Sequence, residues 1–160
     1  MYDFAADPVL PKGELYNELL SAADALTAGE PDAVANMANL AALIWQFVPD
    51  LNWAGFYRLI GEELVLGPFC GKPACIRIPL GQGVCGAAAA QQRTQLVEDV
   101  HEFPGHIACD AASRSELVVP VLRDGRAIAV IDLDSPLPAR FDVEDQAGME
   151  ALAARVAVRI

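Results

Sequence analysis

Four cysteines carry the most versatile chemistry in this chain: Cys70, Cys75, Cys85 and Cys109. No two of them form a C-x-x-C pair, so their spacing does not indicate a zinc site. A reduced thiol is either a small packing residue or a redox nucleophile. For Cys109 both interpretations stay open. It follows His106 in an irregular segment, where an imidazolium would lower the pKa of the thiol, but a buried thiol beside an incidental histidine is the simpler interpretation.

Cys85 stands in the first turn of an expected alanine-rich helix that follows Gly81-Gln82-Gly83. A helix N-terminus stabilises a thiolate and offers free backbone N–H groups to an anion. The segment therefore indicates either a reactive thiol or a carboxylate-binding site built from the backbone of Gly83, Val84 and Cys85. A tight turn that lets the helix pack closely explains the same glycines equally well.

Two aspartates, Asp132 and Asp134, end the apolar run over residues 127–131. Strand alternation places Ile128, Val130 and both aspartates on one face of the sheet. Carboxylates on a buried face are costly unless they serve a cation, so the pattern is a hypothesis for a cation-binding pocket. The alternative is that the strand leaves the core at Asp132 and that both carboxylates are solvated.

The register of a hairpin decides whether Glu116 joins these aspartates. A two-residue loop at Asp124-Gly125 places Glu116 opposite Leu133, whereas a three-residue loop places it opposite Asp132. A bulge at Pro120 would also change the register. Three acids on one face would form a pocket for an ammonium group. Their crowding would raise the pKa of one carboxyl, which could then donate a proton.

Short strands between helices must position these residues. The periodicity predicts helices over 13–28, from 32 to 48, over 84–92 and from Asp142 onward, and strands over 53–60, 64–66, 75–78, 94–97, 116–122 and 126–134. Residues 67–73, with two Gly and two Pro, are expected to form a mobile loop. Trp53 and Tyr57 of the first strand are candidates for the walls of an apolar pocket. Consecutive strands exclude a doubly wound parallel sheet, so the fold class is α+β, an antiparallel sheet flanked by helices.

Length and charge narrow the function further. The 160 residues predict a single domain over 1–160, with an extended arm formed by about the first 12 residues. The formal charge of −11 argues against nucleic-acid and anionic membrane partners. The N-terminus has no signal-peptide pattern, and no apolar window is long enough to span a bilayer. We therefore expect a cytoplasmic protein with reduced cysteines.

Five stretches together resemble the free methionine-(R)-sulfoxide reductases, which are single GAF-domain enzymes. They are residues 52–57, 71–78, 83–86, 103–110 and 113–116, and the resemblance runs from about Tyr16 to the end of the chain. The functional cysteines of the family match Cys75, Cys85 and Cys109, its pocket acids match Glu116, Asp132 and Asp134, and its pocket aromatic matches Trp53. Cys70 matches no feature of the family. The resemblance implies a GAF-like fold, a homodimer, and no metal or organic cofactor.

The reaction implied by the resemblance begins with attack of the Cys109 thiolate on the sulfoxide sulfur. A carboxyl of Glu116 or an aspartate gives a proton to the oxygen, and Cys109 becomes a sulfenic acid. Cys75 then closes a disulfide that thioredoxin reduces. Cys85 competes with Cys109 for the role of nucleophile and is an alternative resolving thiol.

The substrate implied by the resemblance is free methionine-(R)-sulfoxide. The acids would hold its ammonium group, and the amides from Gly81 to Cys85 would hold its carboxylate. Two other classes of protein stay open: a non-catalytic GAF sensor that binds a small molecule, and a structural protein whose cysteines only pack.

Overall fold

The computed structural model describes residues 4–7, 9–105 and 110–160. In chain order its elements are α1 (Lys12–Thr27), α2 (Ala33–Phe47), β1 (Trp53–Ile60), β2 (Glu63–Gly71), β3 (Arg77–Pro79), α3 (Gly83–Gln91), β4 (Gln95–Val97), the short 3-10 helix η1 (Val100–Glu102), β5 (Ser115–Arg123), β6 (Arg126–Ser135) and α4 (Val143–Val156). The strands form one antiparallel sheet in the order β3-β2-β1-β6-β5-β4. The α+β prediction is therefore confirmed.

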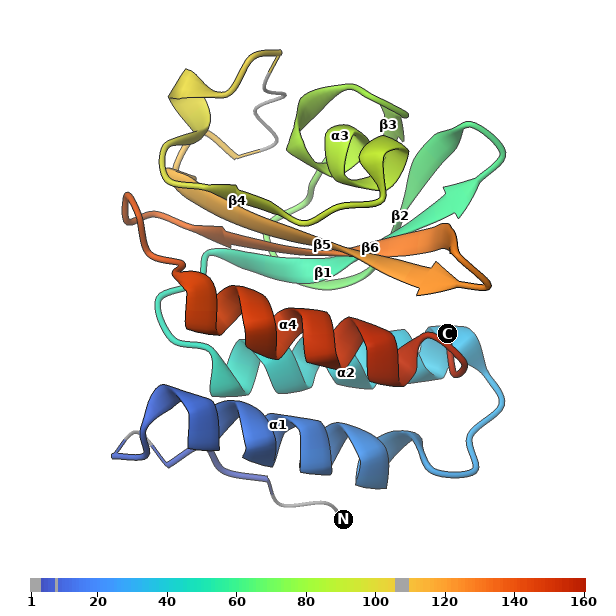
Figure 1. Ribbon diagram of the computed structural model, residues 1–160, viewed down its shortest axis with the longest axis vertical. Coiled ribbons are helices and arrows are strands. Elements are labelled where there is room, and N and C mark those ends of the chain that lie inside the picture. The colour runs from blue at the N-terminus through green and yellow to red at the C-terminus, as the bar shows by residue number, and fades with distance from the viewer. Residues whose placement is uncertain (1–3, 8, 106–109) are drawn as a thin grey trace.

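Helices cover both faces of the sheet (Figure 1). On one face α2 and α4 pack against the strands, and α1 packs beneath these two helices. On the other face lies α3, which contacts β5 and β6. Among the described residues, no helix combines the length and apolar character that a bilayer span requires.

Local capping fixes where two of the sheet-covering helices begin. The Asp32 side chain accepts a hydrogen bond from the backbone N–H of Ala35 at 2.8 Å, and Asp142 with Asp145 forms a capping box at the start of α4. Both starts agree with the sequence prediction, because capping depends on residues only three positions apart.

The two faces of the sheet carry separate clusters of buried side chains. Ala54 and Phe56 of β1 belong to the larger core beneath α2 and α4. Trp53 and Tyr57, which alternate with them, belong to a smaller cluster beneath α3. The second cluster shares its face of the sheet with the candidate site residues.

The stretch expected as a loop over residues 67–73 is mostly strand, and this prediction was wrong. Strand β2 continues to Gly71, with a bulge where Gly67 and Pro68 together face Phe56 of β1. A bulge tolerates a proline because the ladder is already interrupted there. Beyond it, Phe69 stacks on Trp53 with ring centroids 5.2 Å apart, and this contact holds the end of β2 in place.

The strand expected over residues 75–78 is also displaced. Strand β3 covers Arg77–Pro79, so Cys75 lies ahead of it, in the connection from β2. The short ladder with β2 pairs Arg77 with Val65 and Pro79 with Glu63. Cys75 is thus on a connecting segment rather than within the sheet.

The hairpin of β5 and β6 combines a two-residue turn with a bulge. Asp124 and Gly125 have φ of 51° and 73°, which is typical of the type I′ turn that their sequence favours. Next to the turn Leu122 pairs with Ala127, but one pair further Val121 already pairs with Ala129, so Ile128 has no partner on β5.

This bulge corrects two expectations. Glu116 lies opposite Asp134, neither opposite Leu133 nor opposite Asp132, and the register changes beside Ile128 rather than at Pro120. Strand β4 pairs only as far as Val118, so Pro120 lies where that edge of β5 is open and a missing N–H is tolerated.

The bulge also changes which face Ile128 occupies. The prediction placed Ile128 on the face of Val130 and the aspartates, but it packs against the core beneath α2 and α4, whereas Val130 packs beneath α3. The extra residue breaks the strict alternation of faces at this point. Asp132 and Asp134 keep the alternation set by Val130.

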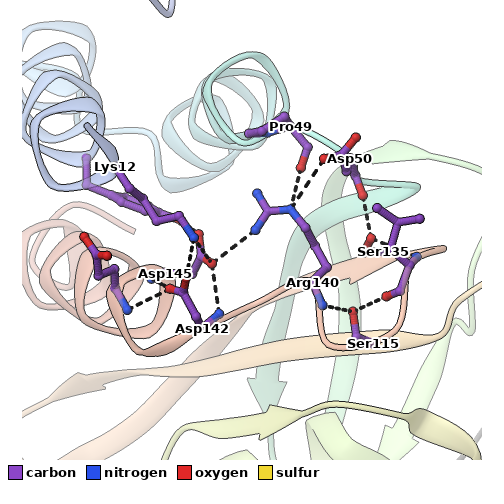
Figure 2. A network of polar contacts seen from close by, with 11 residues as sticks. Lys12, Pro49, Asp50, Ser115, Ser135, Arg140, Asp142 and Asp145 are labelled. Atoms are coloured by element: carbon purple, nitrogen blue, oxygen red, sulfur yellow. Dashed lines mark hydrogen bonds and ion pairs between the residues drawn. The ribbon is translucent and has the colours of Figure 1, made fainter. Parts of the chain in front are cut away.

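A polar network ties the helical layer to the segment that follows the hairpin (Figure 2). Arg140 donates to the Asp145 carboxylate at 3.1 Å and to the carbonyl oxygen of Pro49 at 3.1 Å. Lys12 of α1 reaches Asp145 at 2.8 Å, and Tyr16 donates to it at 2.8 Å. The buried Asp145 therefore joins α1 and α4 to the loop before α4.

Two serines extend this network to the strands that carry the acids. Ser115, which precedes Glu116, accepts from the backbone N–H of Arg140 at 3.2 Å. Ser135, which follows Asp134, donates to the carbonyl oxygen of Asp50 at 2.6 Å. The ends of β5 and β6 are thus held in place immediately beside two of the three acids.

Candidate active site

A cavity lies between the sheet and α3, where most of the candidate residues meet. Its walls come from β1, β3, β5, β6, the start of α3 and residues 110–113 ahead of β5. The lining residues are Tyr57, Ile78, Gly83, Val84, Cys85, Asp110, Ser113, Glu116, Asp132 and Asp134. The hairpin register therefore brings all three predicted acids together, beside the helix start that carries Cys85.

The three acids form a largely buried group with no basic side-chain partner among the described residues. Glu116 and Asp132 are 6% and 5% exposed, and Asp134 is half-buried. No ion pair within the described ranges includes any of them, and Oδ1 of Asp132 has no hydrogen-bond partner there. The arrangement is that of a site for a positively charged ligand group.

The same burial raises the pKa of each carboxyl. For Asp132, burial raises the pKa to about 7, against hydrogen bonds from Cys85 and Glu116 that lower it. For Glu116, burial and then the charges of Asp132 and Asp134 raise the pKa well above its ordinary value. The pKa of Asp134 is raised by burial and by the charge of Asp132. Protons are therefore retained in this group near neutral pH.

Cys85 occupies the third position of α3, as expected, and is 4% exposed. Its Sγ lies 3.9 Å from Oε1 of Glu116. Burial first, and then the charges of Asp132 and Glu116, raise the pKa of this thiol well above its ordinary value. These effects outweigh the helix N-terminus, so the geometry favours a protonated Cys85 when the site is empty.

The start of α3 presents backbone N–H groups to the cavity. The first N–H groups of a helix have no acceptor within the helix, and Gly83, Val84 and Cys85 all line the cavity wall. Gly86 allows the helix to approach β3, because a Cβ there would lie 2.5 Å from the carbonyl oxygen of Pro79. An anion in the cavity would meet this helix start.

Of the two predicted aromatic walls, Tyr57 lines the cavity and Trp53 supports it from behind. The Tyr57 hydroxyl donates to the carbonyl oxygen of Cys75 at 3.0 Å. Trp53 stacks on Tyr57 at 5.8 Å, and its Nε1 donates to the carbonyl oxygen of Lys72 at 3.1 Å. A contact between Trp53 and a substrate methyl group stays a prediction.

The other cysteines are placed differently. Cys109, the predicted nucleophile, and His106 lie outside the described residues. Cys75 is half-buried on the segment between β2 and β3, where its carbonyl group contacts Tyr57. Its thiol is disulfide-bonded, so the expectation of reduced cysteines does not hold for this residue. Cys70 lies on β2, away from the cavity lining, and burial raises the pKa of its thiol.

Sequence reasoning assigned no role to two residues of the cavity rim, Asp110 and Ser113. Asn52 connects them, because its Nδ2 donates to Oδ2 of Asp110 at 3.2 Å and to Oγ of Ser113 at 3.0 Å. A hydrogen bond from Ser113 partly offsets the raised pKa of Asp134. The available signal was their position in the irregular segment directly before Glu116.

Comparison with known proteins identifies the class of this domain. The GAF domain family model matches residues 32–160. The chain is 50% identical over 145 residues to the free methionine-R-sulfoxide reductase of Escherichia coli (strain K12), covering 91% of this chain and 88% of that protein. It is 44% identical over 152 residues to the free methionine-R-sulfoxide reductase of Saccharomyces cerevisiae, covering 90% and 84%.

A solved structure gives the same result. The X-ray structure of free methionine-R-sulfoxide reductase from Neisseria meningitidis in complex with its substrate superimposes with a TM-score of 0.94 at 43% identity, covering 99% of this chain and 95% of that one. The chain therefore belongs to the GAF domain family and, within it, to the free methionine-R-sulfoxide reductases.

Proposed function

We propose that this protein reduces free L-methionine-(R)-sulfoxide to methionine with electrons from its own thiols. The observation that carries the proposal is the cavity in which three acids, with no basic partner in the described part of the chain, face the N-terminus of α3. The Escherichia coli and Saccharomyces cerevisiae relatives carry this activity in their names.

The cavity suits a free amino acid. A positively charged ammonium group would pair with Glu116, Asp132 and Asp134, which would ionise as it enters. A carboxylate would bind the N–H groups of Gly83, Val84 and Cys85. A residue within a peptide has neither terminal charge, so it would leave the buried acids unpaired and would be rejected.

The chemical step follows the cysteine roles of the family. The thiolate of Cys109 attacks the sulfoxide sulfur, and the S–O bond breaks as the oxygen passes to Cys109 with a proton from the site acids. Glu116 suits the role of proton donor, because burial and neighbouring charges keep its carboxyl protonated. Methionine leaves, and Cys109 is a sulfenic acid.

Two thiols supply the two electrons of the reduction. Cys75 condenses with the sulfenic acid of Cys109, which releases water and forms a disulfide. Cys85 is the alternative resolving thiol, since it lines the same cavity. We propose that thioredoxin restores both thiols by exchange, that the protein acts in the reducing cytoplasm as a homodimer, and that it needs no metal or organic cofactor.

A stereochemical assay tests this function. Pre-reduced protein is mixed with dithiothreitol and with the separated R and S forms of free methionine sulfoxide, and methionine is quantified. Product from the R form alone supports the proposal. Binding of either form without product, in protein whose thiols react, would instead identify a sensor domain.

Single-turnover experiments without a reductant assign the thiols. Cys109→Ser should form no methionine, whereas Cys75→Ser should form one methionine per chain, as the parent does, but keep Cys109 as a sulfenic acid where the parent forms a disulfide. Cys70→Ser is the matched control and should turn over like the parent. One methionine per chain from Cys109→Ser would place the nucleophile elsewhere.

A further inference from the structure

We propose that the substrate-free site binds one Zn²⁺ ion through Sγ of Cys85, which is a free thiol, and one carboxylate oxygen each from Glu116 and Asp132. The bound ion would exclude the substrate, so zinc would act as a reversible inhibitor. Only the exclusion of substrate rests on the proposed function, because the ion site itself depends on the three side chains alone.

The geometry of the three side chains is close to that of a zinc site. Their ligand atoms all lie within 4.8 Å of one another, and Sγ of Cys85 is 3.9 Å from Oε1 of Glu116. Around a tetrahedral zinc, bond lengths of about 2.3 Å to sulfur and about 2.1 Å to oxygen place sulfur about 3.6 Å from oxygen, and two oxygens about 3.4 Å apart. Small side-chain rotations therefore complete the set.

Burial and uncompensated negative charge favour the binding of a cation at this site. Cys85, Glu116 and Asp132 are each at most 6% exposed. Within the described ranges none of them has a lysine or arginine partner, and Oδ1 of Asp132, on the cavity wall, is unpartnered. A divalent ion would satisfy this oxygen and balance the carboxylates.

The mixture of one sulfur and two oxygens selects among metals. Mg²⁺ and Ca²⁺ prefer sites built entirely from oxygen, whereas Zn²⁺ accepts thiolate and carboxylate together. On binding, Cys85 loses its proton to solution and the S–Zn bond forms, with no change of oxidation state. Three protein ligands leave the fourth zinc position open to water from the cavity.

The cysteine spacing could not indicate this site. It uses a single cysteine, from the start of α3, and two acids from the neighbouring strands β5 and β6. The three residues meet only because the hairpin register turns Glu116 and Asp132 to the α3 face. The same two acids are those assigned to the substrate ammonium group, so an ion and a substrate cannot occupy the site together.

Cobalt is the probe, because Co²⁺ accepts zinc ligands and its thiolate complexes absorb in the near-ultraviolet. Reduced protein, freed of thiol reagents under argon, is titrated with CoCl₂ and then with ZnCl₂. The expected result is one equivalent of Co²⁺ with a thiolate absorption band, displaced by one equivalent of Zn²⁺. Free methionine should weaken Co²⁺ binding in proportion to its concentration.

Variants assign the ligands. Cys85→Ser should lose the thiolate band, and Glu116→Gln and Asp132→Asn should each weaken Co²⁺ binding by at least the 10–100-fold that loss of an outer-shell partner costs. Cys70→Ser, whose thiol lies outside the cluster, should titrate like the parent.

Three outcomes would overturn the proposal or part of it. Absence of stoichiometric binding to the parent protein would reject the site. A thiolate band that survives in Cys85→Ser but disappears in Cys75→Ser or Cys109→Ser would place the metal on other thiols. Binding unaffected by methionine would reject substrate exclusion. The titration does not depend on turnover, and the methionine assay run with a chelator does not depend on zinc, so the two proposals fail separately.

Discussion

Replacing Asp132 by asparagine should make the protein more stable at high pH than the parent. The pKa of this carboxyl is raised by burial to about 7 in the folded state, against an ordinary value of 3.8. Between these pH values the folded state keeps a proton that the unfolded state has lost. The Asp132 contribution to stability therefore falls as the pH rises from about 4 to about 7 and is constant above that range.

The size of the effect follows from this interval. The interval from pH 5 to the folded pKa of about 7 spans about two pH units, and each unit corresponds to about 1.4 kcal/mol. The free energy of unfolding of Asp132→Asn, relative to that of the parent, should therefore rise by roughly 3 kcal/mol between pH 5 and pH 8. Asparagine keeps the shape of the side chain but has no charge to bury. The same change should weaken binding of an ammonium ligand.

Urea denaturation at pH 5 and pH 8 measures this difference directly, since unfolding free energies extrapolate linearly with denaturant. Glu62→Gln is the matched control, because it removes one negative charge from an exposed turn outside the cavity. The reasoning is refuted if Asp132→Asn and Glu62→Gln show the same change between the two pH values. It is also refuted if Asp132→Asn loses stability relative to the parent as the pH rises.

Three further predictions concern the site and its support. Binding of free methionine at pH 6.5 should release protons, because the ammonium group lowers the raised pKa of the acids; calorimetry in buffers of different ionisation enthalpy measures this release, and none would contradict the ammonium site. Arg140→Ala should lower the free energy of unfolding by about 2 kcal/mol in urea, because it removes one charge-assisted hydrogen bond to Asp145, which keeps its contacts with Lys12 and Tyr16; a loss no larger than that of an exposed arginine would argue against this network. Gly86→Ala should raise KM at least tenfold, because a Cβ 2.5 Å from the Pro79 oxygen displaces the start of α3, and unchanged kinetics would mean that α3 does not bind the substrate carboxylate.

Local signals made much of the fold predictable from sequence. Asp32 and Asp142 mark helix starts through bonds to residues two or three positions away. Asp124-Gly125 marks the hairpin turn, because both positions need a positive φ. The placement of Cys85 in the first turn of a helix also followed from neighbouring glycines.

The structure differs from the prediction where contacts between distant parts of the chain determine the local conformation. Strand β2 continues through Gly67 and Pro68, because it pairs with β1 on both sides of the bulge and because Phe69 stacks on Trp53. Neither the pairing with β1 nor the ring contact can be predicted from the composition of residues 67–73. The rim residues depend on Asn52, which lies about sixty positions earlier in the chain.

The face occupied by Glu116 could not be fixed from the sequence either. Turn chemistry alone predicts the two-residue turn, and that turn without a bulge would pair Glu116 with Leu133. The structure keeps this turn and adds one unpaired residue, which changes the partner to Asp134. Residue counting has no means of locating such a bulge, because its position depends on how Ile128 packs against the helical core.

Because Ile128 has no partner on β5, the hairpin contains one residue more than its strand pairing requires. Deleting this residue would leave Leu122 paired with Ala127 and Val121 paired with Ala129, so the alignment of Glu116 with Asp134 would survive the shorter tip. The loss would be limited to the packing of one half-buried side chain and to local twist. The bulge therefore makes the pairing of Glu116 with Asp134 independent of the exact length of the hairpin tip, so a variant one residue shorter should keep the site.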